Sequence, residues 1–312
     1  MIRTILLRLF SYKDSSTYRL LTVVLSIAAI STLAACKQHT DKRADRIVAV
    51  TIAPQRFFIE AIADSAVQVV PLVPAGSNPE EYDPSPSVMK QLADADAYFY
   101  IGGLGFEQRN LQAIRDNNPR LSIFEMGEAL SHAAHEDHGE ACTHDSHGHS
   151  GGHDPHYWTS IIGAKALGHA AYKALVELYP EQEHRWSEGY GRLEKRIDSV
   201  RAVIDNLFAG GRMDKAFVIY HPSLGYFAEE FGLRQIVIEQ DGKEPSAAHL
   251  HQVIDQARAD NVRIVFIQPE FETRQAEEVA RAIGAEMIRI NPLRGSWEEE
   301  ILHIARSLVN GK

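Results

Sequence analysis

Short apolar runs alternate with longer amphipathic segments along the chain from residue 46 onward. Such runs are typical of strands buried on both faces of a parallel sheet. They cover residues 47–52, 67–73, 97–101, 121–126, 216–220, 234–238, 263–267 and 286–290. Helical patterns separate them, with apolar residues three and four positions apart. Strands that alternate with helices indicate an α/β fold, and the pattern predicts two lobes, each with a mainly parallel sheet of four strands.

The longest helical pattern lies between the two groups of strands. It covers residues 181–210, where apolar side chains recur at helical spacing without an internal proline. At 1.5 Å per residue, a helix of this length is roughly 40 Å long. We expect it to join an N-terminal lobe, residues 46–180, to a C-terminal lobe, residues 211–312, and its rigidity to limit hinge closure between them.

Residues 1–35 have the pattern of a secretory signal. Basic residues precede an apolar run over 20–33 that is too short for a comfortable membrane span. The run ends in Leu33-Ala34-Ala35-Cys36, which resembles the cleavage box of bacterial lipoproteins. The resemblance implies a lipid on Cys36, a polar stalk over 36–45 and an extracytoplasmic, membrane-anchored protein in the periplasm or on the cell surface. A plain signal peptide or anchor helix is the alternative.

Net charge argues against one class of partner, and the cysteine content argues against an internal disulfide. The formal net charge is −10, which argues against nucleic acid because phosphate binding needs basic patches. The chain has two cysteines, Cys36 and Cys142. If Cys36 carries lipid, Cys142 has no partner, and we expect no internal disulfide.

A histidine-rich loop covers residues 132–153 and contains seven histidines among Asp, Glu, Gly and Ser. It has too few apolar residues to form a core. Imidazole is the commonest metal ligand among side chains, so the loop indicates metal collection, with a plain polar spacer as the alternative. The zinc-protease motif His-Glu-x-x-His is absent, since His135-Glu136-Asp137-His138 is one residue too short.

Residues capable of binding a metal also follow five of the predicted strands. They are Glu80, His156, His221, Glu270 and Asn291. Ligands of open parallel sheets bind at the loops that leave the carboxyl ends of strands, so a cleft between the lobes would bring these side chains together. A neighbouring carboxylate, Asp154, is placed to orient His156.

Three short stretches surround these candidates. They read PEEYDP over residues 79–84, DPHYW over 154–158 and YHPSLGYF over 220–227. They resemble motifs of the substrate-binding lipoproteins of zinc and manganese ABC importers: Pro-His-x-Tyr-Glu-Pro, Asp-Pro-His-x-Trp and a strand ending in His. The resemblance implies two α/β lobes joined by a long helix, one bound divalent metal, and delivery of that metal to a membrane permease with its ATPase. A histidine-rich loop before the second motif is frequent in the zinc-binding members.

Two positions depart from the family pattern. Glu80 stands where the family has its first histidine, and Asn291 stands where it has a late aspartate. The resemblance therefore implies His156 and His221 as ligands and Glu80 as an oxygen substitute, while the fourth ligand stays open between Glu270, Asn291 and water. A carboxylate in place of an imidazole shifts the metal preference of the site toward Mn²⁺ or Fe²⁺. The histidine-rich loop favours Zn²⁺, which we expect to be the bound ion.

The predicted function is capture of zinc by a monomer that passes it to an ABC permease, without catalytic turnover. Affinity should fall below about pH 6 as the histidines protonate. Alternatives are a manganese or iron(II) carrier of the same type, a zinc-dependent hydrolase with an open coordination position, and a surface adhesin with a structural metal. No nucleophile elbow and no motif-positioned general base supports the hydrolase.

Overall fold

Two four-stranded parallel sheets form the framework that the apolar pattern predicts. The computed structural model describes residues 46–127, 154–210, 214–240, 242–271 and 274–310. The first sheet has the order β2-β1-β3-β4, with β1 Ile47–Val50, β2 Gln68–Pro71, β3 Ala97–Tyr100 and β4 Ser122–Glu125. The second has the order β6-β5-β7-β8, with β5 Ala216–Ile219, β6 Arg234–Val237, β7 Ile264–Ile267 and β8 Glu286–Arg289. Every pairing is parallel, so the predicted fold class is confirmed.

Both faces of each sheet are covered by helices. The shorter segments of the first half are α3 Ala53–Ala63, η1 Asp64–Ala66, α4 Pro86–Ala93, α5 Gly105–Asn117 and η2 Tyr157–Thr159. Those of the second half are α9 Gly225–Glu230, α10 Ala247–Ala259, α11 Arg274–Ile283 and α12 Trp297–Asn310. Two long helices, α7 Ile161–Leu178 and α8 Glu183–Gly210, connect the halves through the turn η3 Pro180–Gln182.

Alternate residues of the strands face different cores, because side chains of a strand point to opposite faces in turn. In β3, Ala97 and Phe99 belong to a core shared by both halves of the chain, whereas Tyr98 and Tyr100 belong to a smaller core under α4 and α5. The strands of the second sheet alternate in the same way between the shared core and a core under α10 and α11. Burial on both faces explains why the strands read as continuous apolar runs.

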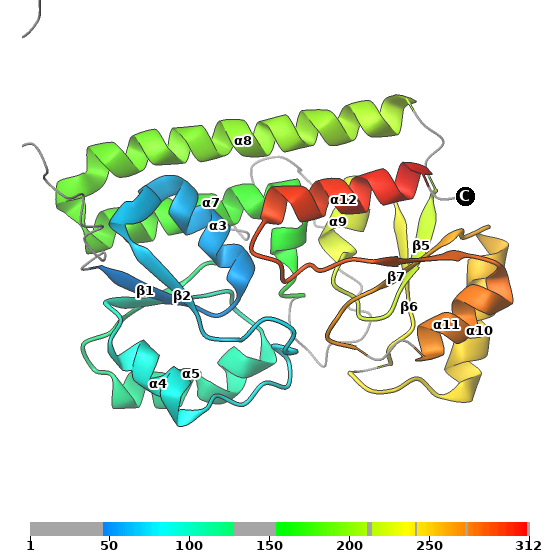
Figure 1. The fold of residues 1–312 in the computed structure, drawn as a ribbon, viewed down its shortest axis with the longest axis horizontal. Helices are drawn as coiled ribbons and strands as arrows, with labels where there is room; N and C mark the ends of the chain where they lie inside the picture. The colour runs from blue at the N-terminus through cyan, green and yellow to red at the C-terminus, as the bar shows by residue number, and fades with distance from the viewer. Residues whose placement is uncertain (1–45, 128–153, 211–213, 241, 272–273, 311–312) are drawn as a thin grey trace, which may run out of the picture. The chain divides into compact units, whose positions relative to one another are not determined.

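The long helix α8 packs against α3 and α7 of the first half and α12 of the second. Figure 1 shows it along the top of the view, above α3, α7 and α12. Its start lies two residues after the predicted one, because Pro180–Gln182 form a 3₁₀ turn first. The approach to α3 requires a glycine, since a Cβ on Gly189 would lie 2.0 Å from the carbonyl oxygen of Ile62.

Several predicted features lie outside the described residues. They are the signal over 1–35, the lipidation site Cys36, the stalk over 36–45, and the histidine-rich loop over 132–153 with Cys142. Within the part of the chain that the structure describes, no helix combines the length and the apolar character that a membrane crossing requires.

Candidate metal site

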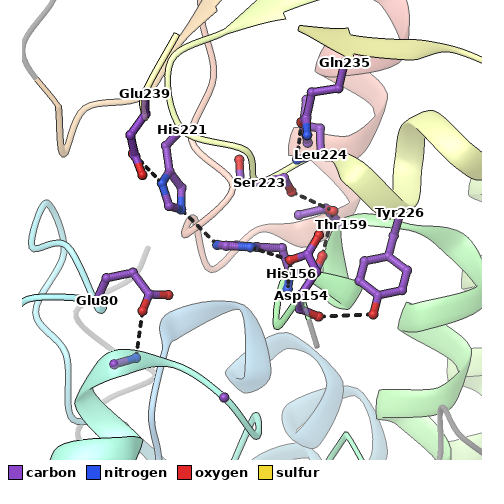
Figure 2. Close-up of polar contacts among 12 residues, drawn as sticks. Glu80, Asp154, His156, Thr159, His221, Ser223, Leu224, Tyr226, Gln235 and Glu239 are labelled. Carbon is purple, nitrogen blue, oxygen red and sulfur yellow. Dashed lines mark hydrogen bonds and ion pairs between the residues drawn. The ribbon is translucent and has the colours of Figure 1, made fainter. Parts of the chain in front are cut away.

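His156 and His221 meet at the carboxyl ends of the two sheets. His221 follows β5 after one residue, and His156 lies just before η2. Their Nε2 atoms are 3.2 Å apart, and the ring planes stand at 73°. The two residues are 3% and 6% exposed, respectively, and Figure 2 shows them at the centre of a set of polar contacts. The sequence prediction that these two residues converge agrees with this geometry.

Three neighbours hold His221 in place. Its Nδ1 lies 2.7 Å from Oε2 of Glu239. Its ring stacks on Phe271, with centroids 4.9 Å apart and planes at 18°. Its backbone N–H and C=O both bond to the side-chain amide of Gln268, at 3.3 Å and 2.8 Å. Both the ring plane and the ring edge are therefore held by surrounding groups.

His156 is oriented by the residue two positions earlier. Oδ1 of Asp154 accepts from the backbone N–H of His156 at 2.9 Å and lies 2.7 Å from its Nδ1. This is the role expected for Asp154 from the sequence. The ring also contacts Trp158, at a centroid distance of 5.2 Å.

The segment that carries His156 is bonded to the second half of the chain. The indole N–H of Trp158 donates to the carbonyl of Pro292 at 2.9 Å. The hydroxyl of Thr159 donates to the carbonyl of Ser223 at 3.0 Å. The position of His156 relative to His221 is thus set by direct hydrogen bonds and not only by the sheets.

The hydrogen bonds at Nδ1 of the two histidines determine whether their Nε2 atoms carry a proton. A carboxylate accepts but does not donate, so Nδ1 of each ring carries the proton. In a neutral imidazole, the other nitrogen then has a lone pair that can accept a proton or bind a metal. Two such lone pairs face each other across 3.2 Å, an arrangement that a cation between them stabilises.

The surroundings shift the pKa values of the two histidines in opposite directions. Burial alone lowers the pKa of His156, but the charges of Asp154, Glu80 and Glu239 outweigh it and raise that pKa above its ordinary value. Burial lowers the pKa of His221, and the neighbouring His156 lowers it further, against the effect of Glu239. The pair therefore takes up one proton, on His156, before it takes up a second, in addition to the protons on the two Nδ1 atoms.

Glu80 lies on the loop after β2, against the start of α5. Its Oε2 accepts from the backbone N–H of Gly105 at 2.8 Å, and its carbonyl accepts from Nη1 of Arg109 at 2.7 Å. A Cβ on Gly105 would lie 2.3 Å from that carbonyl oxygen, so glycine permits the approach. The other oxygen, Oε1, is buried and has no hydrogen-bond partner. Figure 2 shows Glu80 below the two imidazoles.

Glu270 lines the same pocket as His156 and His221, together with Asn78, Pro79, Ser223, Gln268, Phe271, Pro292 and Leu293. Its Oε1 is buried without a hydrogen-bond partner, and burial raises the pKa of its carboxyl group. Asn291 does not line the pocket, and its Oδ1 accepts from the backbone N–H of Leu293 at 3.2 Å. Glu270 is thus better placed than Asn291 to add an oxygen.

The carboxylates and the imidazoles do not form a closed coordination shell in this conformation. Among the described residues, no group of three or more His, Cys, Asp or Glu side chains is close enough to hold one ion. Glu80 is near enough for its charge to act on both histidines, so the acidic groups surround the imidazole pair without closing on it.

The family model for the periplasmic zinc-uptake complex component A, ZnuA, matches residues 48–310. The chain belongs to this family. The match covers both sheets and all the candidate ligands, so the resemblance predicted from the three short motifs is confirmed.

Among ZnuA-family relatives, the high-affinity zinc uptake system protein ZnuA of Bacillus subtilis is 28% identical over 273 residues, covering 85% of this chain and 84% of that protein. The zinc-binding lipoprotein AdcA of Streptococcus pneumoniae is 23% identical over 286 residues, which cover 86% of this chain and 54% of AdcA. The chain therefore spans about half the length of the AdcA proteins that it matches.

Solved ZnuA-type structures share the fold. A ZnuA crystal structure has a TM-score of 0.74 and 29% identity, over 85% of this chain and 98% of that one. A ZnuA deletion mutant with zinc bound has a TM-score of 0.73 at the same identity, over 85% and 97% of the two chains. The periplasmic zinc binding protein TroA of Treponema pallidum, at 17% identity and a TM-score of 0.72 over 85% and 98% of the two chains, agrees in fold.

The sequence interpretation missed Glu239. This residue lies two positions after β6, at the same edge of the second sheet as His221. The rule that pointed to the other candidates, a polar side chain at the carboxyl end of a parallel strand, applies to it equally.

Proposed function

We propose that the protein captures a zinc ion outside the cytoplasm and delivers it to the permease and ATPase of an ABC importer. The observation that carries the proposal is the distance between the two Nε2 atoms. Two nitrogen ligands about 2.0–2.1 Å from a tetrahedral zinc lie about 3.3–3.4 Å apart, close to the 3.2 Å between His156 and His221. Membership of the ZnuA family supports zinc as the cargo.

In this proposal, Glu80 and Glu270 complete the coordination of the ion held by His156 and His221. Each glutamate has a buried oxygen without a hydrogen-bond partner. A buried, unpaired carboxylate oxygen is costly in the absence of a cation. Movement of the Glu80 and Glu270 side chains toward the imidazole pair would give two nitrogen and two oxygen ligands, which is an ordinary set for zinc.

The chemistry proposed is reversible binding without turnover. We assign residues 46–180 and 211–312 to two lobes linked by the helix of residues 181–210. Their shared core, which contains Phe99, Trp158 and Phe217, supports a release that needs only small shifts. A lipid on Cys36 would keep the protein at the membrane that contains the permease.

Metal content and zinc titration test the proposal. The full chain, purified without chelator, should contain zinc, and after stripping it should bind one zinc per molecule more tightly than the histidine-rich loop does. The double variant His156→Ala/His221→Ala should lose this binding. His251→Ala is the control, because His251 is exposed on α10. Manganese or iron in place of zinc would favour the alternative cargo, and tight zinc binding by the double variant would contradict the site.

A further inference from the structure

Glu239 is placed beside His221 by the pairing of β5 and β6. The ladder of hydrogen bonds continues past both strands, since Ile238 N–H donates to the carbonyl of Ile219 at 2.9 Å and Glu239 N–H donates to the carbonyl of Tyr220 at 3.0 Å. The backbone of Glu239 is therefore tied to the residue that precedes His221. Its carboxylate reaches back to Nδ1 at 2.7 Å, as Figure 2 shows.

Burial separates this contact from an ordinary surface ion pair. The side chain of Glu239 is 9% exposed and that of His221 is 8% exposed. The corresponding partner of His156, Asp154, is 31% exposed and belongs to the same turn as its histidine. Glu239 thus places a carboxylate from the end of a different strand in the interior, against the Nδ1 edge of the ring, while Nε2 faces His156.

We propose that Glu239 is a positioning residue of the metal site, which keeps the proton of His221 on Nδ1 and leaves Nε2 free to bind the ion. The inference rests on the zinc-binding function proposed above. Carboxylates that accept from the second nitrogen of a ligating histidine fix its tautomer and its orientation. Here the carboxylate selects the Nε2 lone pair that faces His156.

Phe271 and Gln268, which also hold His221, cannot make this selection. Phe271 stacks on the face of the ring. Gln268 bonds to the backbone of His221 and not to its imidazole. Both restrict where the ring lies, but neither distinguishes a ring protonated on Nδ1 from one protonated on Nε2. Glu239 contacts Nδ1 itself and accepts its proton, while Nε2 faces the other histidine of the site.

Two variants and one control test the proposal in the full chain. Glu239→Gln keeps the size of the side chain, but its amide N–H₂ can donate to Nδ1 and so favour the wrong tautomer. Glu239→Met keeps a similar side-chain length and offers no strong hydrogen-bond acceptor. It replaces Glu239→Gln in the test if that variant does not fold. Glu244→Gln removes the same charge from an exposed position five residues away. Thermal unfolding without metal confirms that each variant is folded.

The first measurement is the imidazole ¹⁵N spectrum of the metal-free protein, which reports the tautomer of His221. Nε2 should be unprotonated in the unsubstituted protein and in Glu244→Gln, and partly or fully protonated in Glu239→Gln. The second is the zinc Kd from competition with a chelator. It should rise about 10- to 100-fold in both Glu239 variants, as is usual for loss of such a partner, and stay unchanged in Glu244→Gln.

Unchanged tautomer and unchanged Kd in folded Glu239→Gln and Glu239→Met would overturn the proposal. A weaker Kd with the tautomer unchanged would also overturn it, because the effect would then be one of charge alone. If the unsubstituted protein bound no zinc, the proposed function would fail. The ¹⁵N comparison would still decide whether Glu239 orients His221.

Discussion

Trp297 donates its indole N–H to the backbone carbonyl of Trp158 at 2.6 Å. Trp297 is the first residue of α12, and Trp158 lies two residues after His156. Both indoles are almost fully buried. The C-terminal helix thus bonds directly to the turn that carries one of the two histidines, so the stability of this contact and the geometry of the site are connected.

Replacing Trp297 with Phe should destabilise the protein through this hydrogen bond. The substitution removes the donor and leaves a buried carbonyl without it, at a cost of about 1–3 kcal/mol, in addition to the loss of ring volume. Trp186→Phe is the matched control, since Trp186 is equally buried and its Nε1 has no hydrogen-bond partner. Urea unfolding of the two variants should show the larger loss for Trp297→Phe, and an equal loss would contradict this account.

Two glycines of α8 should respond to alanine with opposite signs. A Cβ on Gly189 would lie 2.0 Å from the carbonyl oxygen of Ile62, so Gly189→Ala should push α8 from α3 and cost about 1–3 kcal/mol. Gly191 has no atom within 4 Å of the same position. Gly191→Ala should stabilise the protein by about 0.5–1 kcal/mol, because alanine has the higher helix propensity. Thermal unfolding of the metal-free variants measures both signs, and destabilisation by Gly191→Ala would refute the assignment.

Zinc affinity should fall with decreasing pH, chiefly through His156. Burial lowers its pKa, but Asp154 and the other carboxylates raise it above the ordinary value, so the metal-free site keeps a proton to higher pH. Zinc must displace that proton, and below the raised pKa, Kd should weaken about tenfold per pH unit. His221, with its lowered pKa, adds a second proton only at lower pH. A Kd measured in a competition assay that stays constant between about pH 5 and pH 8 would exclude this coupling.

Glu80→Ala should weaken zinc binding at least tenfold, or about 1.4 kcal/mol, because it removes a proposed ligand. Glu81→Ala removes the same charge from the exposed neighbouring residue and serves as the control. Glu80→His should restore zinc binding and raise the preference for zinc over manganese, since imidazole is a softer ligand than carboxylate. Calorimetry with both metals measures these changes. Equal effects of Glu80→Ala and Glu81→Ala would mean that Glu80 contributes only its charge.

Glu107 should make the stability of the metal-free protein depend on pH. Burial raises the pKa of its carboxyl from 4.5 to about 7, although Thr51 and three backbone N–H groups bond to it. The folded state therefore binds this proton more tightly than the unfolded state. Its stabilising effect is complete below the unfolded pKa and is lost as pH rises through about 7.

Raising the pH from about 5 to about 8 should therefore cost the unsubstituted protein more free energy of unfolding than it costs Glu107→Gln. Glu278→Gln, at an exposed position on α11, should behave like the unsubstituted protein. Urea unfolding at several pH values measures the difference. Parallel pH profiles for Glu107→Gln and the unsubstituted protein would show that Glu107 does not change its protonation on folding.

The local pattern of the chain determined the elements and the loops that carry the site. A strand buried on both faces must read as an apolar run, and the helix of residues 181–210 must place its apolar residues three and four apart. Since parallel strands direct their carboxyl ends to one edge, Glu80, His156, His221 and Glu270 could be selected as candidates without coordinates. Family membership likewise followed from three short motifs, and the match over residues 48–310 confirms it.

Only the tertiary structure decided how these loops meet. Both sheets have the same strand order, with β1 and β5 inside their sheets. This order depends on packing between residues far apart in the chain, and so does the 3.2 Å distance between the Nε2 atoms of His156 and His221. Periodicity carries no information about such packing. The pairing of Glu239 with His221 depends in addition on which strands are neighbours and on where each one ends. The sequence by itself therefore determined which residues stand at the sheet edges, and packing decided which of them touch.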